Sequence, residues 1–144
     1  MQLGVMVAIQ EDVTWDGWLR VVDFVERVGF ESIWTSDHLW TVIPGLVKQS
    51  LAMWPALTAA ALRTTQARFG QLVSPTTYRH PVELAQNAVA LDHLSGGRYI
   101  LGVGAGWQER EHEAFGFVLP SPGERLARLR EALQVIRQLW TGEP

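Results

Sequence analysis

Short apolar runs and segments of helical periodicity alternate along this sequence of 144 residues. The runs at 3–9, 32–35, 68–73 and 99–101 have the length of strands, and each is followed by apolar residues at helical spacing. This alternation predicts an α/β fold with a parallel sheet and right-handed crossovers. Two architectures satisfy the pattern: an open doubly wound sheet, and part of a (β/α)8 barrel, which typically has about 250 residues.

The first and last segments carry clear signals of a strand and of a helix. Residues 3–9 are almost all apolar without clean alternation, which predicts a parallel strand covered on both faces. The last helical segment begins at Ser121, where a capping-box spacing and a proline stand together, and it ends at Gly142. Its apolar residues fall on one face, opposite arginines and a glutamate: Leu126, Leu129, Leu133, Ile136 and Trp140.

A glycine-rich stretch ends the fourth apolar run. Gly102, Gly104 and Gly106 alternate with small residues before Trp107, so the backbone leaves the sheet without bulky side chains. The spacing is not a dinucleotide fingerprint, because G-x-G-x-x-G from Gly102 would require glycine in place of Trp107. The stretch predicts either close approach of a flat or anionic ligand to the main chain, or tight packing between strands.

Composition and charge exclude several classes of function. The net charge is −3 and the arginines are scattered, which argues against a nucleic-acid surface. No apolar run approaches the roughly 18 residues of a membrane span, and the first residues lack the features of a signal peptide. There is no cysteine for a disulfide or a thiolate metal site. These observations predict a cytoplasmic protein with no membrane partner.

Ionisable residues follow the second apolar run directly. Asp37 and His38 stand where a buried strand ends, and such an end opens onto the ligand site in both candidate architectures. A histidine there can serve as a proton donor or as a hydrogen-bond partner. The alternative is structural, with Asp37 capping the next segment and His38 packing against Trp40. The hydroxyl of Ser74, beside Pro75, is typical of a turn.

The other histidines are explained by local structure. His80 precedes a proline at a helix start, and His93 lies where it offsets a helix dipole. His112 stands among charged residues, which predicts a solvated helix face. No H-E-x-x-H or H-x-H pattern is present, so the sequence predicts no metal site. It also lacks a G-x-S-x-G elbow and a phosphate-binding P-loop.

Several linked motifs resemble the bacterial luciferase-like monooxygenase family, and above all its branch dependent on the deazaflavin coenzyme F420. They are the segments 35–38, 74–81, 91–98 and 102–107, followed by Glu111-His112 and Phe115-Gly116. The resemblance implies a TIM (β/α)8 barrel fold. Residues 1–144 would then be the N-terminal half of a luciferase-like domain, supplying about the first four βα units.

The resemblance also implies a set of site residues. His38 matches the active-site histidine that acts as proton donor, and a non-proline cis peptide is expected near Gln71-Leu72. Trp107 stands where sugar-phosphate dehydrogenases of the family carry a carboxylate proton acceptor, and tryptophan cannot accept a proton, so that reaction is disfavoured. The positions that match cofactor contacts are Asp37, Ser74, Ala105, Gly106 and, where some relatives have an amide, Arg110.

The function implied is hydride transfer between coenzyme F420 and a small organic substrate. An FMN-dependent monooxygenase is the alternative on the same scaffold, and a non-catalytic half-barrel or interaction module is the alternative from another class. Barrels often hold a cofactor phosphate after strands 7 and 8, which these four units do not include. We therefore expect weak binding of the intact cofactor, and self-association into a homo-oligomer through the open sheet edges.

Overall fold

Four parallel strands form one sheet in the computed structural model, which describes residues 2–45 and 48–142. Their spatial order follows the chain: β1 (Gly4–Val7), β2 (Ser32–Thr35), β3 (Arg68–Gln71) and β5 (Tyr99–Ile100). Strands that add in chain order are typical of a (β/α)8 barrel, whereas a doubly wound sheet reverses direction at a switch point. The predicted α/β alternation is confirmed, and the strand order favours the barrel.

The third and fourth predicted strands are each interrupted. After β3 the chain continues as the two-residue strand β4 (Ser74–Pro75), and after β5 it continues as β6 (Val103–Gly104). These two short strands pair with each other in parallel and extend the sheet toward its carboxyl end. The Leu72-Val73 peptide between β3 and β4 is cis, so the irregular backbone expected here is confirmed one bond further along the chain.

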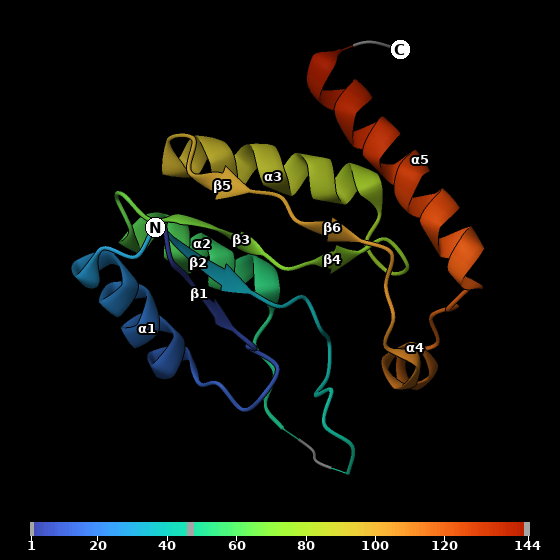
Figure 1. The fold of residues 1–144 in the computed structure, drawn as a ribbon, viewed down its shortest axis with the longest axis horizontal. Coiled ribbons are helices and arrows are strands. Elements are labelled where there is room, and N and C mark those ends of the chain that lie inside the picture. The colour runs from blue at the N-terminus through green and yellow to red at the C-terminus, as the bar shows by residue number, and fades with distance from the viewer. Residues whose placement is uncertain (1, 46–47, 143–144) are drawn as a thin grey trace.

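Helices cover one side of the sheet (Figure 1). The helices α1 (Trp15–Val28), α2 (Met53–Arg63) and α3 (Pro81–Ser95) follow the first three strands, and neighbouring helices pack against each other. The short α4 (Glu109–Phe115) lies beyond the ends of β4 and β6, and α5 (Pro122–Thr141) crosses α3. No helix within residues 2–45 and 48–142 combines the length and apolarity that spanning a bilayer requires.

Local capping explains why the helix ends could be predicted. The Thr14 side chain accepts a hydrogen bond from the Gly17 N–H at 3.1 Å, and Gly29 ends α1 in the left-handed conformation. His80 caps α3 in the same way, because its Nδ1 accepts from the Val82 N–H. Each of these signals is read from residues within one helical turn.

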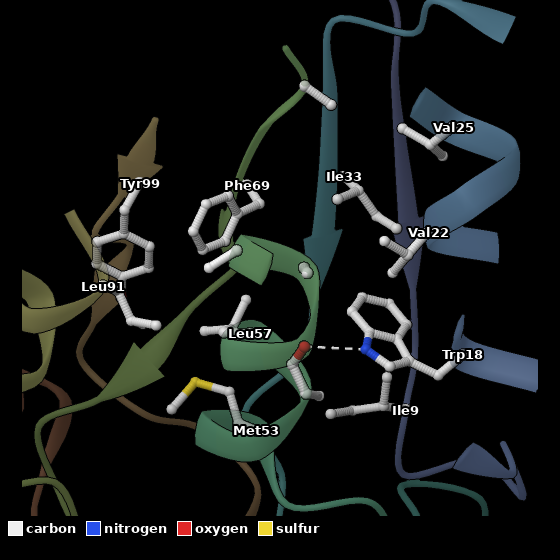
Figure 2. Close-up of a cluster of buried hydrophobic side chains, with 14 of the residues drawn as sticks. Ile9, Trp18, Val22, Val25, Ile33, Met53, Leu57, Phe69, Leu91 and Tyr99 are labelled. Atoms are coloured by element: carbon white, nitrogen blue, oxygen red, sulfur yellow. Dashed lines mark hydrogen bonds between the residues drawn. The ribbon is translucent and has the colours of Figure 1, made fainter. Parts of the chain in front are cut away.

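The core lies between the helices and the outer face of the sheet (Figure 2). Trp18 is fully buried, and its indole N–H donates to the carbonyl of Ala56 at 2.9 Å, which joins α1 to α2. Ile33 and Phe69 project from β2 and β3 into this core, and Leu57 meets them from α2. The sheet is therefore held firmly on one face.

The other face of the sheet is open, and here the prediction of a first strand covered on both sides is wrong. Met6 is 48% exposed and Gly4 is exposed, whereas Val5 and Val7 pack against the core. In a closed barrel the inner face of each strand packs against strands opposite. Four strands curve around only part of that interior, so the inner side chains of β1 remain accessible.

The apolar face of α5 is also largely uncovered. Ala132 and Ile136 are buried where the helix packs on α3, but Leu126 is 62% exposed and Leu133 is 48% exposed. A single supporting helix cannot cover the whole apolar stripe of a helix of this length. Apolar surface is thus available on both sides of the fold.

Glu26 joins α1 to the start of β3. Its carboxylate accepts hydrogen bonds from the backbone N–H groups of Thr65, Gln66 and Ala67 at 2.7–3.0 Å. Burial alone would raise the pKa of Glu26, but these bonds and one from the Thr65 hydroxyl lower it from 4.5 to about 2. The carboxylate form is therefore the one that the folded chain stabilises.

We expect Glu26→Gln to lower the free energy of unfolding by about 1–2 kcal/mol at neutral pH, allowing for solvent screening. Because the pKa is lowered on folding, the contribution is complete above the unfolded value and shrinks between about pH 5 and pH 2. Urea unfolding followed by tryptophan fluorescence measures the effect, with exposed Glu109→Gln as the control. An effect of equal size at both ends of this range would contradict the assignment.

Candidate active site

The segments that follow β2, β4 and β6 converge at the carboxyl end of the sheet. They enclose, together with α4, a hollow of about 260 Å³. Its lining includes ionisable residues after β2 and on α4, and the glycine-rich segment at the end of β6 with the tryptophan that follows: Asp37, His38, Glu111, residues 104–106 and Trp107. A larger hollow of about 480 Å³ lies between α3, the edge of β5 and the end of α5, away from the strand ends.

Asp37 is the most buried carboxylate at this hollow, at 1% exposure. Its oxygens accept two hydrogen bonds from the Arg79 guanidinium, at 2.7 and 3.0 Å, and one from the Ser74 hydroxyl at 2.6 Å. Ser74 is fully buried, lies outside the lining of the hollow and also accepts a hydrogen bond from the Gln71 side chain. The structure therefore brings Asp37 and Ser74 together, with the charge of Asp37 balanced by Arg79.

His38 lies beside Asp37 and is joined to α4. Its Nδ1 lies 3.0 Å from Oε2 of Glu111, and its side chain keeps 17% of its surface accessible. The ring meets Trp107 edge to face, with the ring centres 5.8 Å apart. Trp40, the alternative partner considered from the sequence, packs against Phe115. His38 is thus a partly accessible imidazole with a buried carboxylate behind it.

Glu111 connects α4 to the segment after β2, and apart from its place in the motif resemblance nothing in the sequence singled it out. One carboxylate oxygen accepts from the backbone N–H groups of Leu39 and Trp40, and the other faces His38. Burial alone would raise the pKa of Glu111, but the hydrogen bond and charge of His38 and these N–H groups hold it below its ordinary value. Glu111 is therefore an ionised carboxylate, although it is only 2% exposed.

Tyr78 completes this side of the hollow. Its hydroxyl donates to the backbone carbonyl of Asp37 at 2.6 Å and lies 3.4 Å from Oε2 of Glu111. Burial, together with the charges of Asp37 and Glu111, raises the pKa of Tyr78. The phenol thus stays protonated and acts as a donor.

The prediction that His112 lies on a solvated helix face is wrong. His112 is 1% exposed, and its Nδ1 lies 2.6 Å from the carbonyl of Gln108 while its Nε2 lies 2.7 Å from the Thr77 hydroxyl. A carbonyl only accepts, so Nδ1 carries a proton, and in the neutral ring Nε2 accepts from the Thr77 hydroxyl. His112 thus connects α4 to the loop after β4, and the adjacent Glu111 points toward His38.

The three glycines after β5 have different surroundings. A Cβ at Gly102 would meet the backbone carbonyl of Gln71, and one at Gly104 would meet the Val73 side chain, so tight strand packing accounts for both. Gly106 has a φ of 79°, lines the hollow, and would place a Cβ against Thr77. At Gly106 alone the backbone both adopts a left-handed conformation and faces the hollow.

The remaining candidates divide between the hollow and its surroundings. Ala105 lines the hollow beside Gly106. Arg110 does not line it: its guanidinium lies over the Trp40 ring, 5.5 Å from the ring centre. Within the part of the chain that the structure describes, no group of three or more histidine and carboxylate side chains is arranged to hold a metal ion.

Comparison with known proteins identifies the fold and its family. The sequence model described as luciferase-like monooxygenase matches residues 1–144. The chain belongs to this family. An F420-dependent secondary alcohol dehydrogenase, solved with an F420-acetone adduct, superposes with a TM-score of 0.86 at 28% identity. The match covers 96% of this chain and 42% of that one, which agrees with a partial barrel and confirms the fold class inferred from the sequence motifs.

Two luciferase-like relatives bear on the chemistry. The F420-dependent glucose-6-phosphate dehydrogenase of Amycolatopsis mediterranei (strain U-32) is 40% identical over 121 residues, covering 82% of this chain and 35% of that protein. The 4-hydroxyprotoasukamycin monooxygenase of Streptomyces nodosus subsp. asukaensis is 35% identical over 130 residues, covering 87% and 32%. The chain thus spans about a third of the length of these curated relatives.

Proposed function

We propose that residues 1–144 form the N-terminal half of a luciferase-like domain that transfers a hydride between coenzyme F420 and a small organic substrate. The observation that carries this proposal is the pairing of His38 with buried Glu111 at the strand ends, in a chain 40% identical to an F420-dependent dehydrogenase. Strand ends are where barrel enzymes place their active sites.

The hollow suits one side of a flat, largely apolar ring system. Leu72 and Val73 are 47% and 40% exposed, and the backbone at Gly106 carries no side chain that would keep a ring away. Coenzyme F420 supplies a hydride-accepting deazaflavin ring when bound. We assign its contacts to the backbone of Ala105 and Gly106, and to Asp37 with Ser74 behind it. Arg110 lies outside the lining and is the weakest of the proposed contacts.

His38 is the residue that we assign to proton transfer. Oxidation of an alcohol releases a hydride from carbon and a proton from oxygen, and a partly accessible imidazole at the strand ends can hold that proton. Glu111 stabilises the charged imidazolium that results. In this proposal His38 accepts the proton, Glu111 orients the imidazole, and Leu72 and Val73 provide an apolar surface for the ring of the cofactor.

Trp107 bears on the substrate class. Trp107 is 63% exposed, and its ring lies beside His38. By the resemblance, it stands where the sugar-phosphate dehydrogenases of the family carry a carboxylate. An exposed indole favours an uncharged substrate with an apolar or aromatic part. We therefore propose an alcohol or ketone of this kind in preference to a sugar phosphate.

A monooxygenase that uses FMN is the second candidate. It is supported by the monooxygenase relative, which is 35% identical over 130 residues. Titration calorimetry of the purified chain with F420 and with FMN distinguishes the two. We expect F420 to bind more tightly than FMN, with a dissociation constant above the micromolar range because only half of a barrel is present. Tighter binding of FMN favours the monooxygenase, and binding of neither favours a non-catalytic module.

Self-association is expected because both edges of the four-stranded sheet are open. Strands β1 and β5 lie at the edges of this sheet, where backbone groups lack a neighbouring strand, and Met6 and Trp107 are exposed apolar side chains. A second copy can cover these edges, so light scattering should give a mass above that of one chain. A monomer at high concentration would contradict this expectation. A cytoplasmic location stays a prediction from the sequence.

A further inference from the structure

Glu111 connects two parts of the chain that are far apart in sequence. It lies on α4, and its carboxylate contacts three consecutive residues that follow β2, from 71 to 73 positions away. One oxygen accepts from the N–H groups of Leu39 and Trp40, and the other, Oε2, faces Nδ1 of His38 at 3.0 Å, with the Tyr78 hydroxyl further away at 3.4 Å. The position of the His38 ring is therefore fixed both through its own backbone neighbours and through its side chain.

The contact with Glu111 also determines which nitrogen of His38 carries a proton. An ionised carboxylate only accepts hydrogen bonds, so Nδ1, 3.0 Å from Oε2, must be the donor. In the neutral ring the proton then resides on Nδ1, and Nε2 is the unprotonated nitrogen that carries a lone pair. Nε2 is thus the nitrogen that can accept a proton from a substrate, and Nδ1 never takes part in the exchange.

We propose that Glu111 is the positioning residue of this site, which holds His38 as the Nδ1–H tautomer so that Nε2 exchanges the proton with the substrate. The proton-exchange part of this proposal rests on the proposed function, whereas the tautomer part stands on the geometry alone. The role is that of a carboxylate that orients a histidine through one ring nitrogen and leaves the other for chemistry.

Glu111→Gln tests the proposal with little change in shape. The glutamine oxygen can still accept from the N–H groups of Leu39 and Trp40, so the loop after β2 keeps its support. Its NH2 group then faces Nδ1 of His38 as a donor, which favours the opposite tautomer with the proton on Nε2. Glu113→Gln is the matched control, because Glu113 is exposed on the same helix.

The nitrogen NMR shifts of the imidazole rings report the tautomer directly, with His38→Ala used to assign the His38 signals. We expect the Nδ1–H form at His38 in the wild-type chain and in Glu113→Gln, and the Nε2–H form in Glu111→Gln. The Nε2–H form in the wild-type chain would overturn the proposal, and this measurement does not depend on any variant folding. An unchanged tautomer in a folded Glu111→Gln chain would overturn it equally.

Kinetics provide the second readout. With a panel of secondary alcohols and F420, we expect Glu111→Gln to lower kcat by about 10-fold to 100-fold with little change in KM. A kcat equal to that of Glu113→Gln would show that the tautomer does not matter for catalysis and would overturn the proton-exchange part. If the wild-type chain shows the expected tautomer but no F420 reduction, the proposed function fails while the control of His38 by Glu111 stands.

Discussion

Asp37→Ala is expected to lower the free energy of unfolding by about 3 kcal/mol. The substitution removes three hydrogen bonds and leaves the Arg79 guanidinium, 18% exposed, without its bidentate partner. The carboxylate of Glu83 lies 3.9 Å from the guanidinium, at the limit of an ion pair. Because an uncompensated charge in a low-dielectric position is costly, the loss exceeds that of an ordinary hydrogen bond.

Urea unfolding with tryptophan fluorescence measures this loss, and two variants serve as controls. Asp23→Ala removes a similar pair with Arg63, but both side chains are more than 40% exposed and screened by solvent, so we expect a much smaller loss than for Asp37→Ala. The double variant Asp37→Ala/Arg79→Leu removes both charges and should recover part of the stability. A single-variant loss as small as that of Asp23→Ala would contradict the importance assigned to this ion pair.

The helix ends could be predicted from the sequence because their signals are local. Gly29 ends α1, Pro81 begins α3, and Ser121 caps α5 within a few residues of each boundary. The strand order could not be derived from periodicity, which allowed two architectures. The family resemblance selected the barrel, and the pairing of β1, β2, β3 and β5 in chain order agrees with it.

The inward position of α4 could not be predicted from its own residues. Its composition is strongly charged, and a charged helix face is ordinarily solvated. Two contacts overturn that rule: His112 bonds to Thr77, 35 residues away, and Glu111 bonds to His38, 73 residues away. The pair Glu111-His112 did appear in the motif resemblance, which was the available signal that this helix faces the site.

Asp37 shows how a residue can be placed correctly while its role changes. The sequence located it at a strand end, and the resemblance implied a contact with a cofactor. The structure accounts for its carboxylate through Arg79, 42 residues away, and through Ser74. Asp37 also lines the hollow, so its proposed contact with a cofactor would be made beside the ion pair with Arg79.

His38→Ala is expected to lower kcat/KM for F420 reduction by about 10²-fold to 10⁴-fold, the usual contribution of a positioned acid or base. The expectation rests on the proposed function and on the accessible imidazole held by Glu111. Absorbance of the deazaflavin, followed with a panel of secondary alcohols, gives the rate. His93→Ala is the control, because His93 is exposed in the last turn of α3. Equal rates in the two variants would contradict the assignment.

Rescue by free imidazole separates proton transfer from a structural role for His38. Removing the ring leaves a space between Glu111 and Trp107. A free imidazole that enters this space can donate its N–H to Glu111 and present its other nitrogen to the substrate. We expect the rate of His38→Ala to rise with imidazole concentration. The rate of Glu111→Gln should not respond to imidazole. A rate that does not respond to imidazole, in a folded His38→Ala chain, would indicate that the ring supports the loop after β2 and does not carry the proton.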